Sequence, residues 1–278
     1  MNDLNTLRQL ALALTLAVVT AVAAAHAEPA TPGVYEPEVG QEGKDVVWVP
    51  TPQALVDLML DMAKVTAEDF LVDLGSGDGR TVITAAKRGI RALGIEYDPK
   101  LVELSKQSAE KEGVVARAQF KQADLFETDF SNATVVTMFL LPDINLRLRP
   151  IILGMKPGTR IVSNTFPMGE WEADETSTIP IPSEFYRTAL LWIVPAKVEG
   201  AWKSEQGDLS IKQTFQYIAG TAGQGGVTTA IMHGKLRGEQ ISFKAGSAEY
   251  SGRVNGDTIE GTIKAGGKSA RWRATRGG

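Results

Sequence analysis

The chain has 278 residues, of which 43% are hydrophobic and 22% charged, and its formal net charge is −4. This balance predicts a globular protein, and it lacks the basic excess that would favour nucleic acid as a partner. The chain has no cysteine and only two histidines, which excludes disulfides, thiolate zinc sites and cysteine nucleophiles. We therefore assign no metal-binding residue.

An almost wholly apolar run lies near the N-terminus, at residues 10–25. Arg8 precedes it, and an Ala-His-Ala tripeptide at 25–27 puts small residues where signal peptidase cleaves. These features predict a signal peptide over residues 1–27. An uncleaved membrane anchor is the alternative, although the run is slightly short for a full span. In either case we expect an exported protein, periplasmic or anchored facing outside the cytoplasm, and association with the membrane or envelope stays open.

A linker is predicted over residues 28–45, which are rich in proline, glycine and glutamate and show no periodicity. The apolar residues 46–49 follow, then two prolines around Thr51, then a predicted helix over 53–64 with an apolar stripe. One interpretation makes Thr51 the N-cap of this helix. The other packs the turn beside the glycine-rich loop that comes next, so that Thr51 reaches a bound ligand.

The glycine-rich loop occupies residues 73–79, with the sequence Asp-Leu-Gly-Ser-Gly-Asp-Gly. Apolar residues lead into it and a helical run begins at Arg80, which predicts a strand, a tight turn and a helix start. The glycines permit positive φ and a close approach of backbone to ligand, and the helix start offers free N–H groups. The GxGxG spacing differs from the GxGxxG of dinucleotide sites, so NAD is not favoured.

Two later predicted strands end on an acid. The strand at 91–96 ends at Glu96, about 20 residues after the glycines, where Rossmann-type folds place a carboxylate on ribose hydroxyls. The strand at 118–124 ends at Asp124, which is suited to accept a hydrogen bond from the exocyclic amine of a purine. The alternatives are a solvated strand-end acid for Glu96 and a turn or N-cap residue for Asp124.

A nearly continuous apolar strand is predicted over residues 134–141, as expected of a buried central parallel strand. Pro142 and Asp143 end it at the carboxyl edge, where ligands bind in open α/β sheets. Further elements are predicted at 99–112 and 144–155 (helices) and at 160–166, 171–179 and 187–194 (strands). The alternation predicts an α/β fold with a doubly wound, Rossmann-like sheet over residues 46–197.

The composition changes in the C-terminal part, which is rich in glycine, serine, threonine and lysine with short alternating runs. Hairpin turn signals stand at Gly238-Glu239 and at 255–257. Residues 198–278 are therefore predicted to form a small antiparallel β domain, either a sandwich or an open barrel. Its role is either a stabilising addition or a module that recruits substrate or binds the envelope.

The order of these motifs resembles the class I, seven-strand S-adenosylmethionine-dependent methyltransferases. The glycine turn, Glu96 and Asp124 stand where that family contacts methionine, ribose and adenine. More narrowly, residues 49–52, 73–80 and 139–142, with Phe166-Pro167 and Trp171, resemble the protein-lysine methyltransferases that modify the c-subunit of ATP synthase and the adenine nucleotide translocase. The resemblance covers about residues 46 to 195. Phe-Leu-Leu-Pro at 139–142 also lacks the Asn/Asp-Pro-Pro-Tyr pattern of methyltransferases that act on planar nitrogens.

The resemblance implies an enzyme of the EC 2.1.1 class that uses S-adenosylmethionine as cofactor and a protein lysine as acceptor. The cofactor-binding residues that it implies are Thr51, Asp73, Gly75, Ser76, Gly77, Asp78, Glu96 and Asp124. Asp143 is the catalytic candidate, as a residue that orients the lysine, with Thr137 as an alternative and helix capping as the other role for Asp143. A small-molecule methyltransferase and a non-catalytic binding protein that kept the fold remain alternatives, and oligomeric state is left open.

Overall fold

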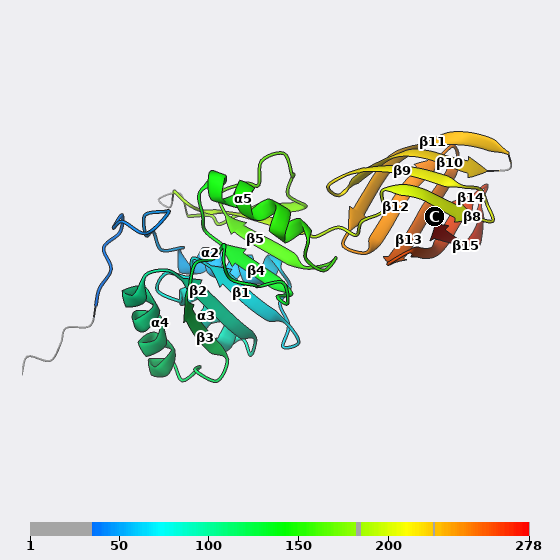
Figure 1. Cartoon of the computed structure of the whole chain (residues 1–278). Helices are drawn as coiled ribbons and strands as arrows, with labels where there is room; N and C mark the ends of the chain where they lie inside the picture. Colours follow the sequence, from blue (N-terminus) through cyan, green and yellow to red (C-terminus); the bar gives the residue numbers. More distant parts are fainter. Residues whose placement is uncertain (1–34, 182–184, 225, 278) are drawn as a thin grey trace, which may run out of the picture. The chain divides into compact units, whose positions relative to one another are not determined.

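The computed structural model describes residues 35–181, 185–224 and 226–277. The predicted signal peptide or anchor lies outside the described residues. A seven-stranded sheet with flanking helices is followed in the chain by a closed barrel of eight antiparallel strands (Figure 1). This confirms the predicted fold class, a Rossmann-like sheet with a C-terminal antiparallel β domain. Within the described ranges, the search for a helix long and apolar enough to span a bilayer finds none.

The sheet domain is of mixed type and has the strand order β3-β2-β1-β4-β5-β7-β6. Strands β1 to β5 run parallel, and β7 runs antiparallel to both β5 and β6. The carboxyl ends of β1 to β5 therefore share one edge of the sheet. The elements in chain order are α2 (Gln53–Met62), β1 (Phe70–Leu74), α3 (Arg80–Lys87), β2 (Arg91–Glu96), α4 (Pro99–Lys111), β3 (Ala118–Gln122), β4 (Val135–Met138), α5 (Pro142–Leu153), β5 (Arg160–Asn164), β6 (Glu175–Thr178) and β7 (Thr188–Ile193).

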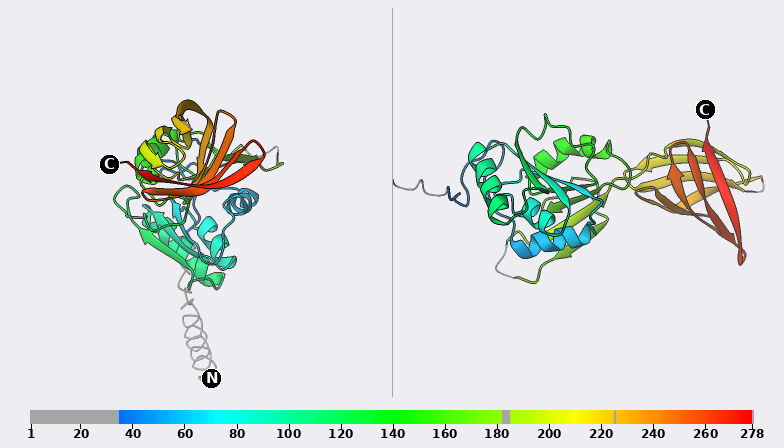
Figure 2. Two further views of the ribbon diagram at one scale, coloured as in Figure 1. Left: turned by 90° about the vertical axis from the view of Figure 1, so that its right-hand side faces the viewer. Right: turned by 90° about the horizontal axis from the view of Figure 1, so that it is seen from below.

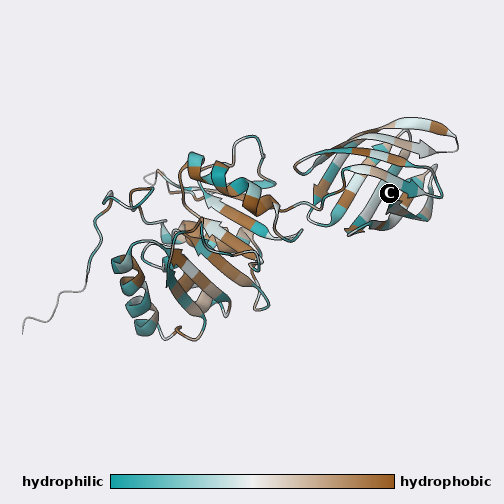
Figure 3. Ribbon diagram, in the orientation of Figure 1, coloured by the Kyte–Doolittle hydropathy of each residue, from teal (hydrophilic) through white to brown (hydrophobic). Residues whose placement is uncertain are grey.

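The sheet is buried on both faces. Successive side chains of a strand point to opposite faces, so Leu71 and Val72 of β1 belong to two different cores. Leu71 packs with apolar residues of α2 and α3, and Val72 packs with those of α5. Figure 2 shows α2 and α5 on opposite sides of the sheet, and Figure 3 shows the apolar residues concentrated in its strands.

Local sequence explains where α4 begins. Asp98 caps α4 by accepting a hydrogen bond from the backbone N–H of Lys100 at 2.8 Å, and Pro99 takes the first helical position. The N-cap role considered for Thr51 is wrong, since Pro52 precedes α2 and no side chain caps it. The Thr51 hydroxyl instead accepts a 3.2 Å hydrogen bond from Asn164, at the end of β5.

The C-terminal barrel is closed, whereas the sequence predicted a sandwich or an open barrel. Closure depends on β8, a short strand that its composition did not reveal, which pairs with both β9 and β15. Trp202, Phe243, Tyr250 and Trp272 are buried in its packed core. The strands are β8 (Gly200–Ser204), β9 (Leu209–Thr214), β10 (Tyr217–Gln224), β11 (Val227–Arg237), β12 (Gln240–Ala245), β13 (Ala248–Asn255), β14 (Thr258–Ala265) and β15 (Lys268–Arg276).

Candidate functional site

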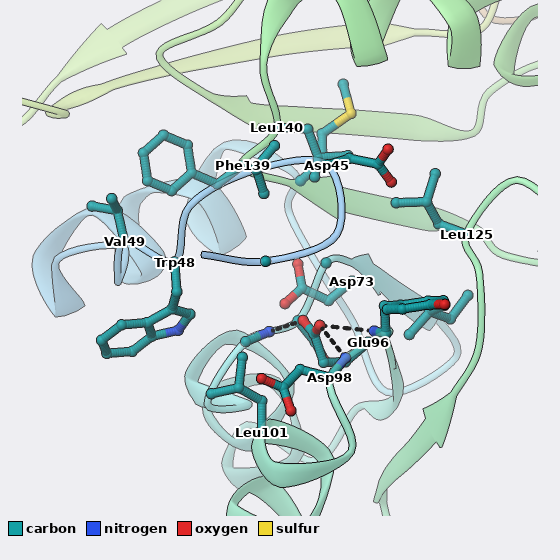
Figure 4. Close-up of a pocket in the computed structure, with 18 of the residues that line it drawn as sticks. Asp45, Trp48, Val49, Asp73, Glu96, Asp98, Leu101, Leu125, Phe139 and Leu140 are labelled. Carbon is teal, nitrogen blue, oxygen red and sulfur yellow. Dashed lines mark hydrogen bonds between the residues drawn. The ribbon is translucent and has the colours of Figure 1, made fainter. Parts of the chain in front are cut away.

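A cleft opens at the carboxyl edge of the sheet, between the glycine turn after β1 and the ends of β2 and β4 (Figure 4). All the residues predicted to bind a cofactor line this cleft: Thr51, Asp73, Gly75, Ser76, Gly77, Asp78, Glu96 and Asp124. Asp143 is not among its lining residues and lies exposed in the first turn of α5. The structure thus brings together residues that are up to 73 positions apart, counting from Thr51 to Asp124 (124 − 51).

The glycine turn is shaped by residues with positive φ. Gly77 has a φ of 54°, and a Cβ there would lie 2.8 Å from the indole Nε1 of Trp48. Gly79 has a φ of 80°, and a Cβ there would lie 2.7 Å from the ring of Phe120. These distances are shorter than a van der Waals contact, so this packing requires glycine at both positions.

Glu96 ends β2 and accepts three backbone hydrogen bonds, drawn in Figure 4. The N–H of Gly77 donates to Oε2 at 2.8 Å, while the N–H groups of Tyr97 and Asp98 donate to Oε1 at 2.7 and 3.0 Å. A carboxylate has about four acceptor positions, so Oε2 keeps capacity for a further donor. Glu96 therefore both fixes the glycine turn and faces the cleft, as its predicted role on a ribose requires.

Asp73 is a buried acid at the floor of the cleft. The Thr137 hydroxyl donates a 2.6 Å hydrogen bond to its Oδ1. The pKa of Asp73 is raised to about 7: burial is the largest cause, the Thr137 hydrogen bond opposes it, and the nearby carboxylates of Glu96 and Asp78 add to the rise. A cationic ligand group beside Asp73 would favour its charged form. Thr137 is fully buried and is not among the residues that line the cleft, which argues against its considered role on an acceptor lysine.

Asp78 is held by Arg80, which donates to both of its carboxylate oxygens, with Nη2 at 2.6 Å from Oδ2. The same guanidinium donates through Nη1 to the carbonyl oxygen of Thr51 at 2.9 Å. One arginine therefore ties the turn around Thr51 to the glycine turn. This agrees with the interpretation that the two turns pack side by side.

Lys44 reaches the cleft from the segment before α2, and its ammonium donates to the carboxylate of Asp124. Lys44 also lies 4.8 Å from the ring centre of Tyr97. The hydrogen bond from Lys44, followed by that from the N–H of Phe126, lowers the pKa of Asp124. Residues 28–45 were assigned to a linker, so sequence reasoning missed Lys44. The apolar residues 46–49, directly before the prolines, were the one signal that this segment packs.

The cleft suits a ligand with an ammonium group, a ribose and a flat heterocycle. Asp73 offers a buried anion, and Glu96 and Asp124 offer acceptors to donors of the ligand. The buried Ser76 hydroxyl has no hydrogen-bond partner among the described residues. Apolar side chains complete the lining, among them Leu101, Leu125 and Leu140. S-adenosylmethionine carries these three groups, so the carboxylate acceptors present in the cleft fit the predicted cofactor.

Comparisons with known proteins agree with this assignment. A family model described as the ANTKMT methyltransferase domain matches residues 73–175. The chain is 44% identical over 133 residues to a protein-lysine N-methyltransferase of Saccharolobus islandicus. The match covers 47% of this chain and 83% of that relative. It is 34% identical over 164 residues to the human lysine N-methyltransferase of the ATP synthase C-subunit, covering 59% of this chain and 66% of that protein.

One solved structure is also similar at the level of sequence. It is an RNA methyltransferase from Salinibacter ruber in complex with S-adenosyl-L-homocysteine, with 46% identity and a TM-score of 0.51. The match covers 54% of this chain and 96% of that one. S-adenosylhomocysteine is the product left when S-adenosylmethionine loses its methyl group.

Proposed function

We propose that this protein methylates the side-chain amine of a lysine in a protein. It belongs to the family of S-adenosylmethionine-dependent methyltransferases that includes the protein-lysine N-methyltransferase of Saccharolobus islandicus. The observation that carries the proposal is the 44% identity over 83% of that relative's length. The geometry supports it, because the predicted cofactor-binding residues line one cleft at the edge of the sheet where ligands of such folds bind.

The chain's own residues would hold the cofactor at three points. Asp73 would pair with its amine, Glu96 would accept from the ribose hydroxyls, and Asp124 would accept from the adenine amine. S-adenosylmethionine, when bound, supplies a methyl group on a positively charged sulfur; attack by a neutral amine forms the N–C bond as the S–C bond breaks and its electron pair stays on sulfur. Since the methyl group is already activated, the protein contributes chiefly by positioning.

The acceptor lysine must lose its proton before it reacts, and the apolar part of the cleft lining favours that loss. Phe139, Leu140 and Ile144 line the cleft, and apolar surroundings lower the pKa of an entering amine. The proton passes to solvent water. Asp143 lies exposed in α5, outside the lining of the cleft, and its role in orienting the lysine stays a prediction.

A labelling experiment tests the proposal. The purified protein is incubated with methyl-labelled S-adenosylmethionine and an envelope extract, and the labelled product is identified by mass spectrometry. We expect label on lysine in a protein, and loss of that label with an Asp73→Ala variant that still folds. Label only in small molecules would refute a protein acceptor, and cofactor binding without any transfer would support a binding protein that kept the fold.

RNA is the second candidate acceptor, favoured by the 46% identity to the Salinibacter ruber RNA methyltransferase. The net charge of −4 argues against it, because binding to phosphate backbones rests on excess lysine and arginine. Adding RNA to the same assay, with and without ribonuclease, separates the two. If ribonuclease releases the label, the acceptor is RNA and the lysine proposal is wrong.

We also propose that the protein is exported, and the support is the apolar run at 10–25 with the Ala-His-Ala tripeptide that follows it. Cell fractionation with N-terminal sequencing tests this. A periplasmic protein that begins at Glu28 is expected. An intact N-terminus in the membrane fraction would indicate an anchor, whereas an intact soluble protein in the cytoplasm would contradict export.

A further inference from the structure

Three aromatic rings meet at the carboxyl edge of the sheet: Phe139, Phe166 and Tyr186, called here the aromatic wall. The rings of Phe139 and Phe166 are nearly parallel, with centres 6.0 Å apart and planes 18° apart. The ring of Tyr186 is inclined by 63° and 54° to these two, at 5.0 and 6.0 Å. All three side chains are only partly buried, so ring surface remains open to a ligand.

Sheet topology puts the aromatic wall next to the cofactor cleft. Phe139 follows β4 and Phe166 follows β5, and these strands are parallel neighbours whose ends lie together. Tyr186 precedes β7, which starts at the same edge because it runs antiparallel to β5. Phe139 belongs both to the wall and to the lining of the cleft. A group held against the wall is therefore adjacent to the cofactor site.

The backbone that carries Phe166 is strained. Thr165 has a φ of 61°, a left-handed conformation that is unfavourable for a β-branched residue. It is held there by hydrogen bonds from its N–H to the Thr188 carbonyl oxygen and from the Phe166 N–H to the Asn164 carbonyl oxygen, both 2.7 Å. The Ser163 hydroxyl donates to the Phe166 carbonyl oxygen at 2.8 Å. Such strain is concentrated at functional sites, and here it presents a partly buried ring beside the cleft.

We propose that the aromatic wall binds the side-chain nitrogen of the acceptor lysine together with its methyl groups, an inference that rests on the proposed lysine methylation. Positive charge grows on this nitrogen as it gains a methyl group, and the faces of aromatic rings attract a cation within about 6 Å. Methylated ammonium groups are also more apolar than the unmethylated ammonium group of lysine. The aromatic wall therefore stabilises the product cation and accommodates more than one methyl group.

A binding experiment without turnover tests the aromatic wall. Protein saturated with S-adenosylhomocysteine is titrated, by NMR, with Nα-acetyl-trimethyllysine methylamide and with its uncharged tert-butyl isostere. Hydrophobic contact alone would favour the isostere, whereas ring faces favour the cation. We expect the wild type to bind the charged probe about three- to tenfold more tightly than the neutral one.

Variants of Phe166 and Tyr186 assign this preference to the aromatic wall, because neither residue lines the cofactor cleft. Phe166→Leu and Tyr186→Leu should abolish the preference for charge, and Tyr186→Phe should retain it. Phe185→Leu is the matched control, since its ring is 94% exposed and lies outside the aromatic wall. Unchanged melting temperature and S-adenosylhomocysteine affinity show that each variant folds.

The outcomes separate this inference from the proposed function. If the wild type methylates lysine but shows no preference for the charged probe, or keeps it in both Leu variants, the aromatic wall is refuted and lysine methylation stands. If the wild type methylates no lysine, the proposed function fails, and the inference that rests on it fails with it.

Discussion

The hydroxyl of Thr137 on β4 donates a 2.6 Å hydrogen bond to the carboxylate of Asp73 on β1. The two residues are direct partners in the register of these parallel strands, and both are buried. The hydrogen bond lowers the pKa of Asp73, but burial outweighs it and raises the pKa to about 7. Asp73 is therefore a carboxyl whose charge near neutral pH depends on whether a cation lies beside it.

Cofactor affinity is expected to depend on pH through Asp73. Because the pKa of Asp73 is about 7, the Asp73 carboxyl is ionised in only a minority of the free protein molecules near pH 6. Calorimetric titration with S-adenosylhomocysteine, whose amine is a cation in this range, should show affinity about tenfold weaker near pH 6 than near pH 8. The control is Asp73→Asn, which should bind weakly with little pH dependence. A wild type with flat affinity would contradict pairing of Asp73 with the amine.

Folding stability should show the opposite trend. Burial raises the pKa of Asp73 from the ordinary 3.8 to about 7, so the folded state binds the proton more tightly than the unfolded chain does. The free energy of unfolding therefore falls as pH rises from about 4 to about 7, and the total decrease is on the order of 4 kcal/mol. Melting curves should show Asp73→Asn equal to wild type near pH 4 and more stable above pH 7. Equal melting temperatures at high pH would refute this.

The glycine turn and the strand-end acids could be predicted from sequence because their signals are local. Asp73, Glu96 and Asp124 each end a predicted strand, and parallel strands bring such ends to one edge. The segment with Lys44 was not predicted to line the cleft, because residues 28–45 show no periodicity and Lys44 owes its place to its long-range contact with Asp124. The position of such a segment is encoded in its partners rather than in its own residues.

Local signals were also insufficient at the end of β4, beside the expected lysine site, and in the barrel. The strand predicted over 134–141 ends at Met138, because the chain turns there to put Phe139 and Leu140 on the cleft. Closure of the barrel required β8, whose five residues pair with strands on both sides. Apolar periodicity does not distinguish a strand that closes a barrel from one at the edge of a sheet.

Replacing Lys44 should strengthen cofactor binding, because its ammonium engages the carboxylate of Asp124 that we assign to the adenine amine. We expect Lys44→Met to raise affinity for S-adenosylhomocysteine by about two- to fivefold, the range of an exposed ion pair. Lys44→Arg keeps the ion pair and is the matched control. Added salt should bring the wild type closer to Lys44→Met. Weaker binding by Lys44→Met would mean that Lys44 contributes to the cofactor site instead of competing for Asp124.

Glu96 is predicted to select for ribose hydroxyls. Glu96→Gln should lose about 1.5–3 kcal/mol of binding free energy toward S-adenosylhomocysteine, as expected for hydrogen bonds to a charged acceptor. Because Glu96 also accepts from Gly77, part of that loss would come from the glycine turn. The 2′-deoxy analogue separates the two effects. The wild type should discriminate against it and Glu96→Gln should not; equal discrimination by both proteins would refute the contact with ribose.

Gly77 and Gly89 form a matched pair for testing how the cleft is built. Both have positive φ, 54° and 87°, but a Cβ on Gly77 would lie 2.8 Å from Nε1 of Trp48, whereas one on Gly89 meets nothing within 4 Å. Each change to alanine should cost about 1–2 kcal/mol of stability from backbone strain alone. Only Gly77→Ala should also displace Trp48, change its fluorescence and weaken binding of S-adenosylhomocysteine. If Gly89→Ala weakened binding equally, the loss would reflect general destabilisation, and the packing of Trp48 on the glycine turn would have no part in holding the cofactor.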